Sequence, residues 1–379
     1  MGIAKYRQVT EWIQNRIASG ELNRGDQIES ENDISRVFGI SRQTVRHALG
    51  LLEQQGILTR IQGSGTFVRD EQAEQEEKKM LSHTVDILTT YVDGYIFPRI
   101  LQSMVERLEK EGYSARIMFT GNRIETERRL LERMLDEGSR DPLIAEPVMS
   151  GLPNPNLKFY RRLLSRGIPI LFFNSFYENL DIPHISMNDV QAGRTATEYL
   201  IEKGHTRIGG IFKADDGQGR RRYLGYLKAL GHAGIEVNES RVTWVDTLEM
   251  KDFSRIMEKI QYRLSGCTAC VCYNDEVAYE LTRRFLKTGK RIPEDISIIG
   301  IDNSELAKLN PVPLTSVGHH IEDLGNYVAE AILRMIREPG CDVTYEFPVS
   351  LKDRMSVCQY TEQKKNNTGG YENESTEKI

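Results

Sequence analysis

The sequence predicts a two-part protein of the α/β class: an N-terminal winged helix-turn-helix joined to a two-lobed, doubly wound α/β domain. Three observations lead to this prediction. The chain has 379 residues, more than one hydrophobic core usually serves. Residues 1–69 have the pattern of three short helices and a hairpin. From Thr84 onward strands and helices alternate, which is typical of a parallel sheet with helices on both faces.

Capping residues mark the elements of the N-terminal unit. Apolar residues recur at helical spacing before Gly20, which ends the first helix. Ser30 is a candidate N-cap for a second helix that Gly39 closes, and Ser41 caps a third. After Gly56, the segments "ILTR" and "TFVR" are predicted to form two short strands around a glycine-containing turn.

The third helix has one apolar face and one basic face. Val45, Ala48, Leu49 and Leu52 share the apolar face, and Arg42, Gln43 and Arg46 lie on the other. In a DNA major groove, Arg can donate two hydrogen bonds to guanine and Gln can bind adenine. Such a face can also simply be solvated, but the neighbouring helix and hairpin favour a DNA-binding module. Residues 1–69 hold nine Lys and Arg against seven Asp and Glu, a net +2 in a chain of net charge -5.

The segment "QGSG" predicts a close approach of the hairpin tip to a phosphate or the minor groove. Gly63 and Gly65 lack side chains that would collide there, and Gln62 lies at the tip. A mononucleotide phosphate loop is excluded because it needs a helix after its glycines, and here strands flank them. An ordinary glycine hairpin turn remains the alternative.

The segment from "KYRQVTEW" to "GSGTFV" resembles the GntR-family winged-helix domain over its whole length. This resemblance implies contacts with double-stranded operator DNA from matching positions, namely Lys5, Arg42, Gln43, Thr44, Arg46, Gln62 and Gly63. One departure is Glu29, which stands where the family usually has Pro. We expect this substitution to loosen the turn before the second helix.

Residues 70–82 are charged, lack apolar periodicity and predict a linker, and the polar residues 361–379 predict a disordered tail. Between them, residues 83–360 predict a second domain. Its expected strands are "TVDILTT", "ARIMF", "IPILFF", "RIGGIF", "ACVCYN" and "DISIIGID". Its expected helices cover residues 99–111, 125–137, 188–204 and 220–230 and the segment "DEVAYELTRRF".

Ligands of open α/β sheets bind beyond the carboxyl ends of the strands. The candidates at these ends are Tyr95, Phe97, Glu146, Asn174, residues 213–216, residues 274–276 and Asp302. Carboxylates, amides and basic groups among aromatic rings suit a polyhydroxylated ligand. The alternative for each residue is a structural role, since Asn274 or Asp275 could cap the following helix.

Segments "YLIEKGHTRIGGIF", "CYNDEVA", "IPEDISIIGID", "PLTSV" and "FPVSLKDRMSV" resemble, in order, the effector-binding domain of LacI-type repressors, which is like periplasmic sugar-binding proteins. On matching positions, the resemblance implies that Arg222, Asp275 and Asp302 bind effector. Placement at strand ends adds Tyr95, Glu146, Lys213 and His319. For His319, capping a helix remains an alternative to binding ligand.

A GntR-type reader joined to a LacI-type sensor is similar to the arabinose-responsive repressors of Gram-positive bacteria, which implies L-arabinose as the effector. We therefore expect a cytoplasmic, homodimeric repressor without catalytic residues, metal, cofactor or membrane segment. A sugar-modifying enzyme and a transport-type sugar-binding protein are the alternatives. Cys267 and Cys270 form a CxxC pair, but no second pair or paired histidines complete a zinc site, and Cys270 and Cys272 are expected as buried strand residues.

Overall fold

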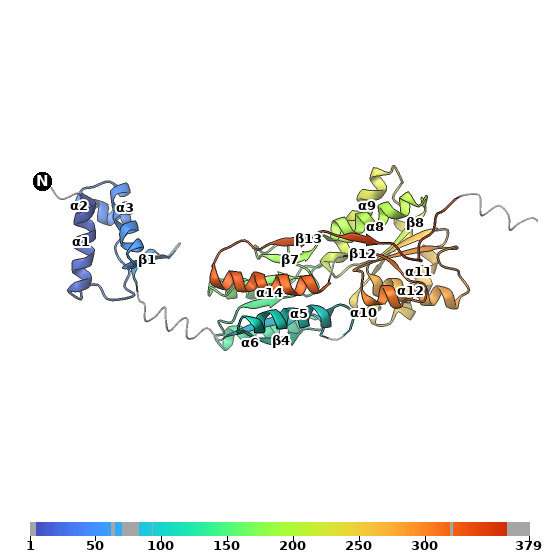
Figure 1. Cartoon of the computed structure of the whole chain (residues 1–379), viewed down its shortest axis with the longest axis horizontal. Coiled ribbons are helices and arrows are strands. Elements are labelled where there is room, and N and C mark those ends of the chain that lie inside the picture. The colour runs from blue at the N-terminus through green and yellow to red at the C-terminus, as the bar shows by residue number, and fades with distance from the viewer. Residues whose placement is uncertain (1–4, 62–64, 70–82, 93, 319–320, 362–379) are drawn as a thin grey trace, which may run out of the picture. The chain divides into compact units, whose positions relative to one another are not determined.

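In the computed structural model, the described residues are 5–61, 65–69, 83–92, 94–318 and 321–361. They belong to two compact units, Met1–Ser82 and His83–Ile379 (Figure 1). The predicted linker at 70–82 and the predicted tail beyond residue 361 lie outside the described residues, so both stay predictions.

The first unit has the predicted winged helix-turn-helix topology. Its elements are α1 (Lys5–Ala18), α2 (Glu31–Phe38), α3 (Arg42–Gln54), β1 (Leu58–Ile61) and β2 (Gly65–Val68). The side chains of Ser30 and Ser41 accept hydrogen bonds from backbone N–H groups in the first turns of α2 and α3, as predicted. Gly39 ends α2 with a left-handed φ of 59°. The two strands pair antiparallel.

Apolar residues from all three helices and both strands form the core of this unit. Val45, Ala48, Leu49 and Leu52 are buried there together, which confirms the predicted apolar face of α3. Glu29 does not leave the turn loose. Its carboxylate accepts two hydrogen bonds from Arg16, at 2.7 and 2.8 Å, and Arg16 also donates to Glu21, so ion pairs tie this turn to α1.

The second unit consists of two lobes, each with a six-stranded sheet (Figure 1). The first sheet has the order β13-β7-β6-β5-β3-β4, and all its strands are parallel. Its strands are β3 (Thr84–Thr89), β4 (Ser114–Phe119), β5 (Leu143–Ala145), β6 (Ile170–Phe173), β7 (His184–Met187) and β13 (Tyr345–Phe347). Its core joins α5 (Phe97–Lys110) and α14 (Ile321–Arg337) on one face, and α6 (Ile124–Asp136) and α7 (Leu157–Ser165) on the other.

The second lobe has the sheet order β14-β12-β11-β10-β8-β9, in which only β14 is antiparallel to its neighbour. Its strands are β8 (Ile208–Lys213), β9 (Val242–Val245), β10 (Ala269–Cys272), β11 (Ser297–Ile301), β12 (Thr315–Gly318) and β14 (Ser350–Lys352). Helices α8 (Asp189–Glu202) and α9 (Gly217–His232) cover one face. The other face is covered by α11 (Met257–Arg263), α12 (Asp275–Lys287) and α13 (Glu305–Leu309). Both lobes are doubly wound, as predicted.

The chain passes between the lobes after β7, after β12 and after β13, so neither lobe is a continuous segment. The lobes also touch directly. The backbone N–H of Gly217 donates to the Ser150 hydroxyl at 2.9 Å, Gly151 N–H donates to the Asp215 carbonyl at 3.0 Å, and Arg220 donates to the Gly151 carbonyl at 2.7 Å. We call these contacts the lobe seam.

Two glycines allow α8 and α9 to pack closely. A Cβ atom at Gly193 would lie 2.0 Å from the Arg222 carbonyl oxygen, and one at Gly225 would lie 2.1 Å from the Val190 carbonyl oxygen. Both obstacles are backbone atoms, which cannot move without separating the helices. The contact therefore fixes the position of Arg222, whose side chain lines the cavity described below.

Gly193→Ala should lower the free energy of unfolding by about 1–3 kcal/mol, since overpacking at a rigid contact costs that much. Gly231→Ala is the matched control, because Gly231 lies in α9 and a Cβ atom added there would meet nothing within 4 Å. It should stabilise the protein by about 0.5–1 kcal/mol through helix propensity. Urea unfolding of both variants checks this pair, and a Gly193→Ala protein as stable as wild type would contradict the packing explanation.

Candidate functional site

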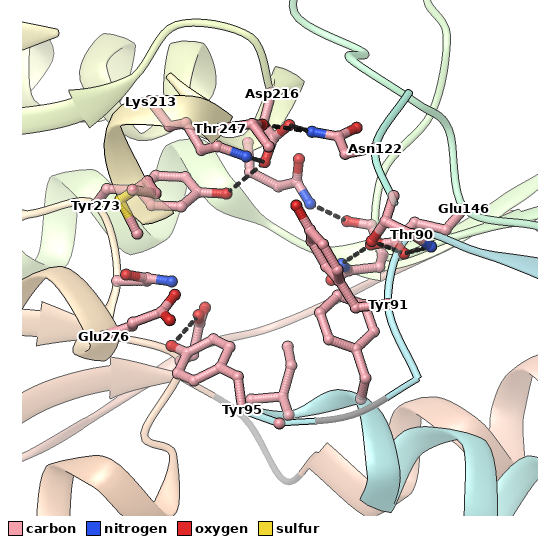
Figure 2. A pocket seen from close by; sticks show the side chains of 18 of the residues that line it. Thr90, Tyr91, Tyr95, Asn122, Glu146, Lys213, Asp216, Thr247, Tyr273 and Glu276 are labelled. Atoms are coloured by element: carbon pink, nitrogen blue, oxygen red, sulfur yellow. Dashed lines mark hydrogen bonds and ion pairs between the residues drawn. The ribbon is translucent and has the colours of Figure 1, made fainter. Parts of the chain in front are cut away.

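A cavity of about 270 Å³ lies between the two lobes of the second unit (Figure 2). Its lining comes from segments that follow β3, β4, β5 and β6 in one lobe and β8, β9, β10 and β11 in the other. This is the location expected for ligands of parallel sheets. Of the predicted effector residues, Tyr95, Glu146, Lys213, Arg222 and Asp302 line the cavity.

Glu146 forms one wall, directly after β5. Its carboxylate accepts hydrogen bonds from the Thr90 backbone N–H at 2.7 Å, from the hydroxyls of Thr89 and Thr90, and from Asn174 Nδ2 at 2.7 Å. Burial raises the pKa of Glu146, and these donors oppose the rise. The carboxylate is thus held in place by its own lobe.

Two buried cations lie in the opposite wall, and both are paired. Lys213 Nζ is 2.7 Å from Asp216 and 3.6 Å from Asp215. Arg222 donates to Asp189 and Asp302, both at 2.8 Å, and to the Tyr273 carbonyl at 2.6 Å. Burial lowers the pKa of each cation, but the neighbouring carboxylates outweigh it and raise the pKa of both. Both cations are therefore charged and already neutralised.

Tyr95 connects the lobes across the floor of the cavity. It follows β3 with a φ of 53°, which is unusual for a residue other than glycine. Its hydroxyl donates to Asp302 Oδ2 at 2.5 Å and accepts from the Asp275 backbone N–H at 3.2 Å. Figure 2 shows the ring pointing into the cavity beside this bond.

Asp275, another predicted effector residue, does not line the cavity. Its side chain is fully buried behind the wall, where it accepts from the backbone N–H and hydroxyl of Ser304 and from the Ser316 hydroxyl. Burial, and then the charge of Asp302, raise the pKa of Asp275 to about 7. The helix cap is Asn274, which accepts from Val277 N–H at 3.0 Å.

Several lining residues were not predicted from sequence, among them Tyr91, Asn122, Gln218, Thr247 and Tyr273. Tyr91 and Asn122 lie just beyond β3 and β4, so the strand-end rule could have identified them. Thr247 follows β9, a strand that was not predicted. Asn122 crosses between the lobes, since its Nδ2 donates to Thr247 Oγ1 at 2.7 Å and to Asp216 at 3.3 Å.

The chemistry of the cavity suits a small uncharged polyol. Tyr91, Tyr95, Phe97 and Tyr273 supply aromatic surface for the CH groups of such a ligand, and carboxylates and amides supply hydrogen-bonding groups for its hydroxyls. The two buried cations, Lys213 and Arg222, are already neutralised by carboxylates, and Lys251 is an exposed lysine of the lining. The cavity volume is near the lower end of the roughly 300–1,000 Å³ of ligand pockets, which suits one small molecule.

In the first unit, the predicted DNA-binding residues Lys5, Arg42, Gln43 and Arg46 are exposed. Thr44 is half-buried, and its hydroxyl lies 2.9 Å from that of the N-cap Ser41. Gln62 and Gly63 lie outside the described residues, as does His319 in the second unit.

Arg46 does not project freely into solvent. Its guanidinium bonds both carboxylate oxygens of Glu31, at 3.2 and 2.9 Å, and Arg60 bonds the same carboxylate. The Glu31 side chain is 19% exposed and that of Arg46 is 65% exposed. Hydrogen bonds from Arg46 lower the pKa of Glu31, despite partial burial.

Cys267, Cys270 and Cys272 are free thiols buried in an apolar core cluster of the second lobe. Within the described ranges, no group of three or more His, Cys, Asp or Glu is arranged to hold a metal ion. None of the helices in those same ranges has the length and apolar character needed to span a membrane.

Comparisons with known proteins assign both units. Residues 5–68 match the family of bacterial regulatory proteins known as the gntR family, and residues 197–357 match the periplasmic binding protein-like domain. The fold is similar to that of the solved complex of the transcriptional regulator CelR with cellobiose. That similarity has a TM-score of 0.65 at 18% identity and covers 87% of this chain and 100% of the other.

The chain is also similar to two arabinose metabolism transcriptional repressors. The repressor of Halalkalibacterium halodurans is 35% identical over 344 residues, which cover 89% of this chain and 91% of the relative. The repressor of Geobacillus stearothermophilus is 36% identical over 346 residues, which cover 90% of this chain and 93% of the relative. With regulators and not enzymes as its relatives, this chain is a transcriptional repressor that belongs to the family of the arabinose metabolism transcriptional repressors.

Proposed function

We propose that this repressor binds operator DNA through α3 and the β1–β2 hairpin and leaves it when L-arabinose occupies the cavity between the lobes. The observation that supports the sugar most directly is the small cavity of aromatic rings and polar groups, in which both buried cations are neutralised. The names of the similar repressors support arabinose in particular. The protein would act in the cytoplasm, where its operator lies.

The DNA-reading residues remain those predicted from the sequence: Lys5, Arg42, Gln43, Thr44, Arg46, Gln62 and Gly63. The pair between Arg46 and Glu31 does not prevent Arg46 from reading a base. An exposed pair of this kind is worth about 0–1 kcal/mol, and a bidentate contact with guanine about 1–3 kcal/mol of discrimination. Glu31 keeps Arg60 as a partner when Arg46 turns to the DNA.

We infer that the repressor acts as a homodimer. One small winged helix-turn-helix unit rarely provides enough affinity for an operator, and two such units can bind its two half-sites. Sugar binding must then favour an arrangement with weaker operator affinity. For each tenfold loss of operator affinity, the sugar must bind that arrangement better by about 1.4 kcal/mol.

Asp275 takes a positioning role in this proposal. Its carboxylate fixes Ser304, two residues beyond Asp302, and so holds the segment that bonds Arg222 and Tyr95. Glu146, Lys213 and Arg222 shape the cavity in the same way, through bonds within the protein. His319 remains an effector-binding candidate, and the only support for it is that it follows β12 in the sequence.

Arg46→Ala should lower affinity for the operator by about 1–3 kcal/mol and lower affinity for random duplex much less, because only the operator offers the guanine contact. Fluorescence anisotropy with both duplexes at one salt concentration measures the difference. Arg283→Ala, on the exposed surface of α12, removes the same charge and should leave both affinities unchanged. Unchanged discrimination in Arg46→Ala would contradict the base-reading role.

L-arabinose should stabilise the full-length protein against thermal unfolding and lower its operator affinity over the same concentration range. At 100 times its dissociation constant, a ligand stabilises by about 2.7 kcal/mol. A panel with D-xylose, D-ribose and arabinose 5-phosphate tests selectivity, and the phosphate group should gain no affinity from Lys213 and Arg222, because both are already paired. Conversion of a sugar into a product would instead support the enzyme alternative.

A further inference from the structure

Most polar groups in the cavity have already used their hydrogen-bonding capacity inside the protein. Glu146 accepts from three residues of its own lobe. Lys213 is paired with aspartates. Asp302 accepts from Arg222 through one oxygen and from Tyr95 through the other. A sugar that bound these groups would have to compete with existing bonds.

Tyr91 is different. Its ring packs edge-on against Phe97, with centroids 5.7 Å apart, which sets its direction. Its hydroxyl makes no hydrogen bond to any residue that the structure describes, and Figure 2 shows it directed into the middle of the cavity. Burial raises the pKa of Tyr91, so the hydroxyl is a neutral donor and acceptor at physiological pH.

Glu276 is another open group, and it comes from the other lobe. The side-chain oxygen of Gln218, which also lines the cavity, is likewise without a hydrogen-bond partner among the described residues. Glu276 lies in the first turn of α12, two residues after the N-cap Asn274. Its carboxylate has no hydrogen-bond or ion-pair partner among the described residues, although it lines the cavity. In Figure 2, Glu276 and Tyr91 lie on opposite sides of the open centre. Two carboxylate oxygens can accept from two adjacent hydroxyls of one sugar.

We propose that Tyr91 and Glu276 make direct polar contacts that recognise the sugar, Glu276 by accepting from a pair of vicinal hydroxyls and Tyr91 by bonding a hydroxyl on the opposite side. This inference rests on the proposed function of the cavity. Because Tyr91 follows β3 and Glu276 lies in the first turn of α12, a sugar held by both joins the two lobes. Glu146, Lys213 and Arg222 then act as the frame of the site.

The test uses the full-length protein with L-arabinose in isothermal titration calorimetry. Glu276→Gln should weaken sugar binding about tenfold or more, because it removes bonds to a charged acceptor. Tyr91→Phe keeps the ring and should weaken binding about threefold to tenfold. Neither side chain is hydrogen-bonded to a described residue of the protein, so both variants should fold. Thermal unfolding without sugar measures what the loss of the Glu276 charge, which lies in the first turn of α12 and interacts with Lys213, does to stability.

Two substitutions serve as matched controls. Glu280→Gln lies one turn further along α12, where Glu280 pairs with Arg283, and Tyr262→Phe removes a hydroxyl from a residue that is 82% exposed. Both should bind L-arabinose like wild type. The sugar concentration that half-releases the operator should rise in Tyr91→Phe and Glu276→Gln by the same factor as the dissociation constant.

The outcomes separate this inference from the proposed function. A wild-type protein that binds no pentose of the panel overturns the proposed function and this inference together. Wild-type protein that binds L-arabinose, with both variants binding it equally well, overturns this inference alone. Variants that lose sugar affinity only in proportion to lost thermal stability would show a structural role for these side chains and would also overturn it.

Discussion

The buried guanidinium of Arg222 is the interaction on which the geometry of the cavity depends. It joins Asp189 at the start of α8, the Tyr273 carbonyl at the end of β10 and Asp302 after β11, so three segments meet at one charge. Breaking a buried pair by removing one partner typically costs about 3–5 kcal/mol, because a charge stays behind unpaired. Asp302 in turn receives Tyr95 from the other lobe. The position of Arg222 therefore also constrains Tyr95, which belongs to the other lobe.

In this cavity, some polar residues hold the walls in place and others are free to contact a ligand. Sequence patterns do not distinguish these two roles. Ionic side chains at strand ends are expected to bind ligand, yet here Lys213, Arg222 and Asp302 are bonded to one another or to near neighbours. A residue such as Tyr91, whose hydroxyl makes no hydrogen bond to a described residue, is harder to identify as a ligand contact from the sequence than an ionic residue. A frame of satisfied charges keeps the cavity in shape, and a few open groups are left to select the occupant.

The sequence was sufficient for the elements with strong local signals. Serine caps and left-handed glycines mark the helices of the first unit, so Ser30, Gly39 and Ser41 were predicted in their observed roles. The short elements β7, β9, α7 and α10 (Thr247–Lys251) were missed, because segments of four to nine residues give little periodicity. The 17-residue helix α14 was not predicted either, and its length does not explain that omission. The pairing of Arg46 with Glu31 and the placement of Asp275 behind the wall depend on how separate segments pack, which residue spacing does not encode.

The lobe seam has a consequence for how sharply the repressor responds. Gly217, Gly151 and Arg220 make bonds between the lobes that involve no ligand atom. Part of the free energy that holds the lobes together is therefore built into the polypeptide, and the effector supplies only the remainder. Evolution can tune the induction threshold of such a protein at the seam, without altering a single residue that discriminates one carbohydrate from another.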